Sequence, residues 1–116
     1  MISWKEGEER AAAHLRSMGY VIEARNYRNR RGEIDIIASK DDTLVCIEVK
    51  TWKQLPVESI EYSIDRKKQQ TYIQLCNVFL EKNRMFHDHF VRFDVMYIDA
   101  STGQIRHIAD AFMESG

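Results

Sequence analysis

The sequence predicts an α/β protein with a mixed central β-sheet flanked by helices, in the order αβββαββ. Two segments, 4–18 and 62–83, carry apolar residues at helical spacing. The segments between and after them are short, rich in β-branched residues and bounded by polar turns, which is typical of strands. Strands in two groups separated by a helix indicate a sheet with helices packed on it. The length of 116 residues is that of one ordinary domain, and we expect a single domain over 1–116.

Two neighbouring runs, 33–37 and 45–50, predict a β-hairpin around which the other elements are arranged. A two-residue turn at 41–42 sets Asp35 directly opposite Glu48. Because strand side chains alternate, one face of this hairpin is charged and the other is apolar. The charged face carries Glu33, Asp35, Glu48 and Lys50, with Glu33 opposite Lys50. The apolar face, expected in the core, carries Ile34, Ile36, Ala38, Val45, Ile47 and Val49.

The pair of acids leaves two interpretations open. Like charges directly opposite each other destabilise a sheet. At about 5 Å they repel by about 0.8 kcal/mol in water, but by about 3 kcal/mol at an effective dielectric of about 20. On a solvated outer face the pair therefore costs little. On a covered face it needs a cation or a shared proton, and it then marks a site.

The first helix is expected from Trp4 to Met18, with Ser3 as its N-cap and Gly19 as its C-terminal stop. Its apolar stripe consists of Trp4, Ala11, Leu15 and Met18. Glu8 occupies the remaining position of that stripe. A carboxylate on the buried side of a helix is costly unless it is paired or bound to a metal. The alternative is that Glu8 reaches solvent near the helix end or meets an arginine.

Segment 25–32 holds four arginines, an aromatic residue and no acid, and it leads directly into Glu33. Arginine presents forked donors suited to phosphate, and Tyr27 offers a ring on which a base can stack. The alternative is a solvated, mobile loop. Lys68 continues the apolar stripe of the second helix by one turn. It is expected to reach a phosphate or the polar pocket, or else to keep its ammonium in water.

The rest of the chain is expected to complete the sheet and the core. A loop of uncertain end covers 51–60, and the second helix follows. Its stripe is Tyr72, Leu75, Cys76, Phe79 and Leu80. Strands are expected at 91–99 and 104–108, with Phe112 as a C-terminal anchor and with Arg92 paired to Asp94.

Composition excludes several classes of protein. No apolar run approaches membrane-spanning length, and the N-terminus lacks a signal-peptide pattern. Cys46 and Cys76 fall in apolar periodic segments, so we expect small reduced core residues in a cytoplasmic protein. His87 and His89 are expected in an ordinary polar loop, because no second pair has metal-ligand spacing. The net charge of −1 argues neither for nor against nucleic acid.

An Asp on one strand and Glu-X-Lys on the next, after a helix with an inward Glu, resemble the PD-(D/E)XK nuclease superfamily. More narrowly, the chain resembles the bacterial YraN-like family, which is related to archaeal Holliday-junction resolvases. The resemblance runs almost end to end and implies a restriction-endonuclease-like fold. It departs at Trp52, where members often carry an Arg, and at Cys46, where they carry an aromatic. The matching residues are Gly7-Glu8, Ala11-Ala12, Leu15, Asn26, Arg28, Gly32-Glu33-Ile34-Asp35, Ile47-Glu48-Val49-Lys50, Lys68, Arg92-Phe93-Asp94 and Asp110-Ala111-Phe112.

The motif and the resemblance together assign roles. The catalytic residues are Asp35, Glu48 and Lys50. Mg²⁺ or Mn²⁺ is expected on Asp35 and Glu48, on Glu8 if the first helix packs over their face, and, as the resemblance implies, on the backbone carbonyl of Val49. The nucleic-acid backbone is expected on Arg28, Arg30, Arg31 and Lys68. Glu33 and Asn26 are expected as accessory residues.

The sequence therefore predicts a metal-dependent nuclease that hydrolyses phosphodiesters, in DNA rather than RNA, in repair or recombination. Phosphate contacts carry no sequence preference, so we expect selectivity for branched, flapped or end-bearing structures. The alternative is a catalytically silent nucleic-acid-binding or protein-interaction module on the same fold. A nuclease that makes two cuts would benefit from a homodimer, although the sequence shows no interface pattern.

Overall fold

The computed structural model describes residues 1–52 and 65–112, and in them it confirms the predicted order αβββαββ. The elements are α1 (Trp4–Ser17), β1 (Val21–Asn29), β2 (Gly32–Lys40), β3 (Thr43–Trp52), α2 (Arg66–Lys82), a 3₁₀ helix (Arg84–Phe86), β4 (Phe90–Asp99) and β5 (Ile105–Phe112). The strands form one five-stranded sheet in the order β1-β2-β3-β4-β5. Only β3 and β4 run parallel, so the sheet is mixed, as expected.

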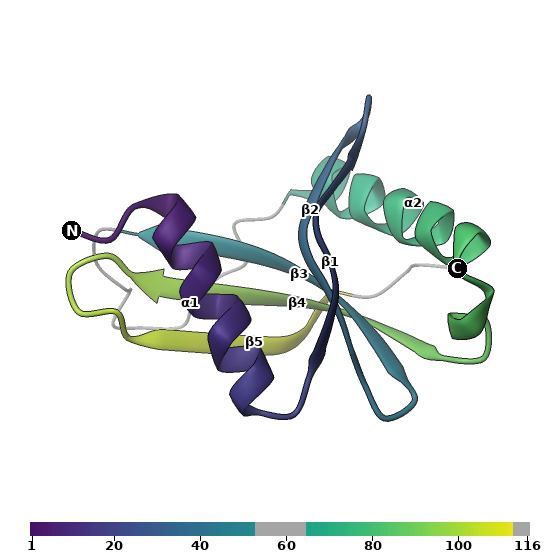
Figure 1. The fold of residues 1–116 in the computed structure, drawn as a ribbon. Helices are drawn as coiled ribbons and strands as arrows, with labels where there is room; N and C mark the ends of the chain where they lie inside the picture. The colour runs from purple at the N-terminus through teal and green to yellow at the C-terminus, as the bar shows by residue number, and fades with distance from the viewer. Residues whose placement is uncertain (53–64, 113–116) are drawn as a thin grey trace.

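The two helices cover opposite faces of this sheet and define two clusters of buried side chains (Figure 1). The α1 face buries Ala11, Ala12, Leu15, Ile36, Ala38, Val45, Ile47, Met96 and Ile98. The α2 face buries, among others, Ile34, Ile37, Leu44, Cys46, Tyr72, Leu75, Cys76, Phe79, Phe93 and Phe112. The face of the hairpin that carries Glu48 is therefore covered by α2 and is not a solvated outer face.

Helix α1 begins as predicted, with the Ser3 hydroxyl accepting from the backbone N–H of Glu6 at 3.2 Å. Its buried stripe is rotated from the expected one and consists of Gly7, Glu8, Ala11, Ala12 and Leu15. The burial predicted for Trp4 and Met18 is wrong, since they are 62% and 53% exposed at the two ends of the helix. The burial of Glu8 is confirmed, with 8% exposed.

The rotation of α1 brings Gly7 directly against Thr51 of β3. A Cβ at Gly7 would overlap the hydroxyl oxygen of Thr51 and lie 3.1 Å from its Cβ. We expect Gly7→Ala to destabilise the protein by about 1–2 kcal/mol, although alanine is the better helix former. Thr51→Ala, which removes a buried hydroxyl without a partner in the described residues, should recover most of that loss in the double variant. Urea unfolding of the four proteins measures this coupling, and additive losses would contradict the contact.

The predicted hairpin register is confirmed from Lys40↔Thr43 to Ile36↔Ile47, and the ladder between β2 and β3 ends there. The expected pairings of Asp35 with Glu48 and of Glu33 with Lys50 are not part of it. Asp35 Oδ2 instead accepts from the backbone N–H of Val49 at 2.8 Å. Where β2 and β3 separate, the carboxylate of Asp35 thus accepts the hydrogen bond that a backbone carbonyl would accept in a regular ladder.

Beyond this point β1 and β2 change which side chains face α2. Ala24 and Tyr27 both pack on the α2 cluster, and so do Ile34 and Ile37, although neither pair has the even spacing of a regular strand. Asn26 has φ 52°, in the left-handed region that asparagine tolerates better than most residues. We call residues 27–34, the part of the hairpin beyond Asn26, the β1–β2 arm. It extends beyond the sheet beside α2, at the top of Figure 1.

The arm corrects three expectations. Ile34 does not share a face with Ile36, because the alternation changes at Asp35. The alternative of a mobile loop for segment 25–32 is wrong for residues 25–29, which form the end of β1. Tyr27 is not available for stacking on a base, because its ring packs edge-on against Phe79 of α2, 5.4 Å between centroids. Its apolar ring holds the arm on α2.

The structure also tests the predictions made for α2, the last strand and the cysteines. The apolar stripe of α2 is confirmed, with Leu80 half-buried, and α2 is capped by Asp65. The expected start of this helix at 62–64 lies outside the described residues, as does most of the loop 51–60. Strand β5 is longer than predicted and includes Phe112, which stacks on Phe93 at 4.8 Å. Both cysteines are buried and free.

A polar cluster between β4 and β5 is fully satisfied within the protein. Arg92 donates twice to Asp94, both at 2.9 Å, which confirms the predicted pair. His107 Nε2 lies 2.6 Å from the same carboxylate, and the backbone N–H of Asp110 donates to it. Burial alone would raise the pKa of Asp94, but the partners, with His107 first, hold it below its usual range. The cluster therefore joins two strands and has no unmet demand for a ligand.

Candidate functional site

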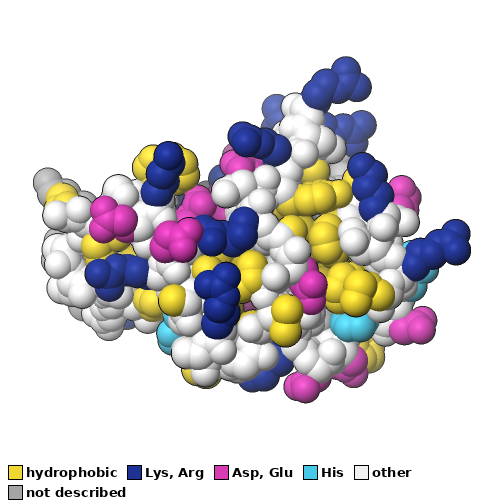
Figure 2. Space-filling model, viewed as in Figure 1, with side chains coloured by type: hydrophobic (Ala, Val, Ile, Leu, Met, Phe, Trp, Pro, Cys, Tyr) yellow, Lys and Arg dark blue, Asp and Glu magenta, His cyan; other side chains and the backbone are white. Residues whose placement is uncertain are grey.

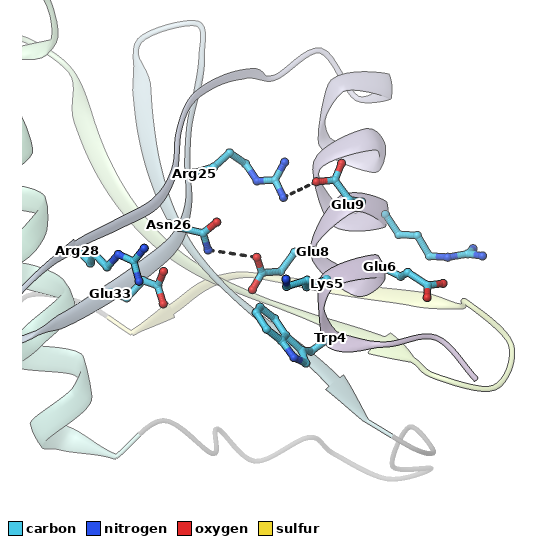
Figure 3. Close-up of a pocket in the computed structure, with 10 residues that line it drawn as sticks. Trp4, Lys5, Glu6, Glu8, Glu9, Arg25, Asn26, Arg28 and Glu33 are labelled. Atoms are coloured by element: carbon cyan, nitrogen blue, oxygen red, sulfur yellow. Dashed lines mark hydrogen bonds and ion pairs between the residues drawn. The ribbon is translucent and has the colours of Figure 1, made fainter.

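The acidic residues singled out in the sequence come together where β2 and β3 separate. Asp35 lies at the change of direction in β2, and Glu48 lies on β3 beneath α2. Glu8 was expected as a metal ligand if the first helix packed over the face of the acids, but helix α1 covers the other face of the sheet. The carboxylate of Glu8 nevertheless acts electrostatically on Asp35, at the point where β2 no longer pairs with β3. Asn26 donates to Glu8 Oε1 at 3.2 Å and so holds it on the site (Figure 3).

Asp35 binds a proton far more strongly than an ordinary aspartate. Burial is the largest cause, and the negative charges of Glu8, Glu48 and Glu33 add to it. The hydrogen bond from Val49 works in the opposite direction and offsets only part of the effect. Together they raise the pKa of Asp35 to about 7. The side chain thus changes charge near neutral pH, and a nearby cation would favour its ionised form.

Glu48 is 4% exposed, and its two oxygens have different environments. Oε1 forms an ion pair with the ammonium of Lys68 on α2, which confirms that Lys68 reaches the polar pocket. Oε2 has no hydrogen-bond partner in the part of the chain that the structure describes. A buried carboxylate oxygen without a partner is costly, so this atom has an unmet demand for a proton donor or a cation.

Tyr72 lies in the same environment, and the sequence indicated only a core role for it. Its ring is fully buried on α2. Burial raises the pKa of the Tyr72 hydroxyl strongly, and the charges of Asp35 and Glu48 raise it further. The neighbouring hydroxyl therefore stays protonated. The helical spacing of Lys68 and Tyr72, four residues apart, was the available signal that both face the hairpin.

Lys50 and Glu33 lie at the border of this site. Lys50 is half-buried on β3, two residues after Glu48 and hence on the same side of the strand. Glu33 pairs across the arm with Arg28 and not with Lys50. Catalytic and accessory candidates therefore occur within one short stretch of the hairpin.

The predicted phosphate-binding arginines belong to the arm. Arg28 lies on β1, Arg30 is exposed at the tip, and Arg31 donates to Gln74 of α2 at 2.6 Å. Figure 2 shows Lys and Arg side chains gathered at the end of the molecule where Figure 1 places the arm. Lys68 is separate from this group, since it pairs with Glu48. The arm is thus a basic projection next to an acidic site.

Two cavities flank the base of the arm. One of about 780 Å³ lies between α1 and β1 and includes Glu8, Asn26 and Arg28 in its lining. The other, of about 260 Å³, lies between the arm and the start of α2 and includes Lys68 and Tyr72. Glu33 lines both of them. The two cavities therefore meet the arm at Glu33, and Glu8 and Lys68 line one cavity each.

The residues present are suited to a hard divalent cation. Within residues 1–52 and 65–112, no three His, Cys, Asp or Glu side chains already lie close enough to enclose an ion. Three carboxylates nevertheless act on this point, one of them with a partnerless buried oxygen, and carboxylate oxygens are the ligands that Mg²⁺ and Mn²⁺ prefer. At present Lys68 supplies the positive charge that Glu48 requires.

This arrangement is consistent with the restriction-endonuclease-like class of α/β folds. The chain belongs to the family described as "Uncharacterised protein family UPF0102", whose model matches residues 7–98. That span contains Glu8, Asp35, Glu48, Lys50 and Lys68. The family part of the predicted resemblance is therefore confirmed, and the superfamily part stays a prediction.

Similar proteins occur in distant bacteria. A UPF0102 protein of Persephonella marina is 42% identical over 115 residues, which cover 97% of each chain. A UPF0102 protein of Treponema denticola is 36% identical over 119 residues and 92% of each chain. One from Pseudomonas aeruginosa is 35% identical over 100 residues, 86% of this chain and 80% of the relative. Among the described residues, no helix is long and apolar enough to cross a membrane.

Proposed function

We propose that this protein is a metal-dependent nuclease of the PD-(D/E)XK superfamily that cuts DNA according to its structure and not its sequence. The observation that carries the proposal is the buried acidic site itself. Asp35 and Glu48 lie under α2 with Glu8 acting on the same point, and Glu48 keeps one buried oxygen without a partner. A purely structural role would favour neutral or fully paired side chains at this position.

Each side chain has a role in this chemistry. Asp35, Glu48, Glu8 and the carbonyl of Val49 would hold Mg²⁺ or Mn²⁺. When bound, such an ion polarises a phosphate and lowers the pKa of a coordinated water. Lys50 can orient the attacking water or stabilise the negative charge that develops at phosphorus. Lys68 neutralises Glu48 in the free protein and lies where it can turn to a phosphate.

The basic arm would hold the nucleic-acid backbone. We expect Arg30→Gln to weaken binding equally for unrelated DNA sequences and to reduce the slope of log affinity against log salt by about 0.9. Anisotropy titrations at several salt concentrations in EDTA measure this effect. Arg84→Gln, an exposed arginine beyond the far end of α2, serves as the matched control and should leave the slope unchanged. An unchanged slope in the Arg30 variant would remove the arm from the binding surface.

A second candidate is the catalytically silent binding module on the same fold. The ion pair between Lys68 and Glu48 favours it, because it meets half of the demand for charge without a metal. The two candidates differ in one assay. Linear, flapped and four-way-junction DNAs are incubated with Mg²⁺, Mn²⁺ or EDTA. A nuclease cuts at least one of them with metal and none in EDTA, whereas a silent module binds DNA and cuts none.

A further inference from the structure

Trp4 is a large aromatic side chain left in solvent on the first turn of α1. Its exposed fraction of 62% contrasts with Trp52, which is half-buried and packs edge-on against Tyr97 at 4.9 Å. A single exposed apolar residue needs no special explanation. Trp4, however, lines the larger of the two cavities, whose opposite wall includes Glu33, an acid whose charge acts on Asp35.

The cavity has the size of a ligand site, and its lining combines one indole with charged and polar side chains. Its volume of about 780 Å³ is within the range of small-molecule pockets. In Figure 3, Trp4 and Glu8 extend from α1 on one side, while Asn26, Arg28 and Glu33 lie on the hairpin on the other. Glu8 and Glu33 are two of the three residues whose charges act on Asp35. A molecule in this cavity therefore lies between the indole and Glu33 and beside Glu8.

The cavity is lined by four acids and four cations, of which only Glu9 and Arg25, 2.8 Å apart, form an ion pair in the described residues. Glu8 accepts from the neutral amide of Asn26. The ammonium of Lys5 lies 5.6 Å from the centroid of the Trp4 ring. Neither Lys5 nor Arg28 forms an ion pair with any other residue that the structure describes. An aromatic face beside free cations is the arrangement by which proteins hold unpaired nucleotides.

We infer that this cavity binds one unpaired nucleotide of DNA, with its base stacked on Trp4 and its phosphates beside Lys5 and Arg28. The inference rests on the proposed nuclease function and narrows its substrate class. A base inside a duplex is stacked on its neighbours and reaches an indole within a cavity only after it is flipped out, whereas a single-stranded base avoids most of that cost. The favoured substrate therefore presents single-stranded DNA, a flap or a frayed end, beside the acidic site. Trp4 precedes the residues that the family model matches, so the inference concerns this chain and not the family.

The test measures binding in EDTA, so that cleavage plays no part. The probes are a fluorescein-labelled thymidine oligonucleotide of about 12 residues and a blunt hairpin duplex of similar length. Loss of one stacked base corresponds to about 1–3 kcal/mol, so Trp4→Ala should weaken binding of the single strand by about 5- to 150-fold. Binding of the blunt duplex should change less than twofold. Trp4→Phe should retain most of the single-strand affinity, since a phenyl ring also stacks.

Two controls separate stacking from folding. Met18→Ala removes an exposed apolar side chain at the other end of α1 and should change neither affinity. Unlabelled oligonucleotide should quench the tryptophan fluorescence of the wild type, and Trp4→Phe should abolish this quenching because only Trp52 remains. Wild type that binds no single strand, or a Trp4→Ala variant that binds both probes as the wild type does, would overturn the inference.

Failure of this inference is distinguishable from failure of the proposed function. Metal-dependent cleavage with an affinity that does not depend on Trp4 would remove the nucleotide site and leave the nuclease. Loss of single-strand binding in Trp4→Ala without cleavage of any DNA would leave the nucleotide site on a silent module.

Discussion

Replacing Glu48 by glutamine should lower metal-dependent cleavage by on the order of 10³-fold while leaving the protein folded. The two side chains have nearly the same shape, and glutamine places a neutral amide where the buried carboxylate lies. The loss follows because an uncharged amide is a poor ligand for Mg²⁺ or Mn²⁺. Lys68 loses its partner, but its side chain is 46% exposed and can turn to water.

Single-turnover rates on the DNA that the wild type cuts best provide the measurement. Glu81→Gln is the matched control, since Glu81 is an exposed acid on α2 outside both cavities. It should cut as the wild type does. A Glu48→Gln variant that retains cleavage within tenfold of the wild-type rate would show that the acidic site is not the catalytic centre.

Asp35→Asn should stabilise the metal-free protein, and more so at pH 8 than at pH 5. The pKa of Asp35 is about 7 in the folded protein and near 3.8 in the unfolded chain. Below pH 3.8 Asp35 is protonated in both the folded and the unfolded state, so it does not lower the free energy of unfolding. As the pH rises towards 7, the unfolded chain releases the proton while the folded protein retains it, so stability falls; above 7 the loss is constant. The variant lacks this loss, and its amide oxygen can still accept from Val49.

Urea unfolding in EDTA at the two pH values measures this difference. The full shift corresponds to about 4 kcal/mol, but solvent contact at Asp35 reduces it, and we expect the advantage of the variant to grow by about 2 kcal/mol from pH 5 to pH 8. Comparison with the wild type cancels the histidines, which titrate in both proteins. Mn²⁺ at pH 8 should reverse the order by stabilising only the wild type. A constant difference between the two pH values would contradict the raised pKa.

Much of the fold could be predicted because it rests on local patterns. The Asp41-Asp42 turn determines the hairpin register, and the Ser3 cap determines the start of α1. The acids of the site could be found because the hairpin register brings Asp35 close to Glu48, although the ladder between β2 and β3 ends one residue before that pair. The inward Glu8 followed from its place in the helical stripe.

The rest depends on contacts between distant parts of the chain. Asn26 adopts a left-handed conformation only because the arm packs on α2, and no residue type in segment 25–29 demands it. The change of alternation at Asp35 likewise moves Ile34 to the α2 face, and Tyr27 packs on the α2 cluster. Trp4 was expected in the buried stripe because a four-residue spacing is compatible with two neighbouring faces of the helix. The contact of Gly7 with β3 determines which of these faces is buried, and Trp4 lies on the other. The burial of Glu48 beneath α2 likewise depends on tertiary packing.

The most direct test of the metal site is a calorimetric titration of Mn²⁺ into the wild type and into Glu48→Gln at pH 8, above the pKa of Asp35. We predict saturable binding in the wild type, release of protons as Asp35 ionises, and no saturable binding in the variant. If neither protein binds Mn²⁺ at millimolar concentration, or if both bind it equally, the acids where β2 and β3 separate do not form a metal site. The proposed nuclease function would then be wrong.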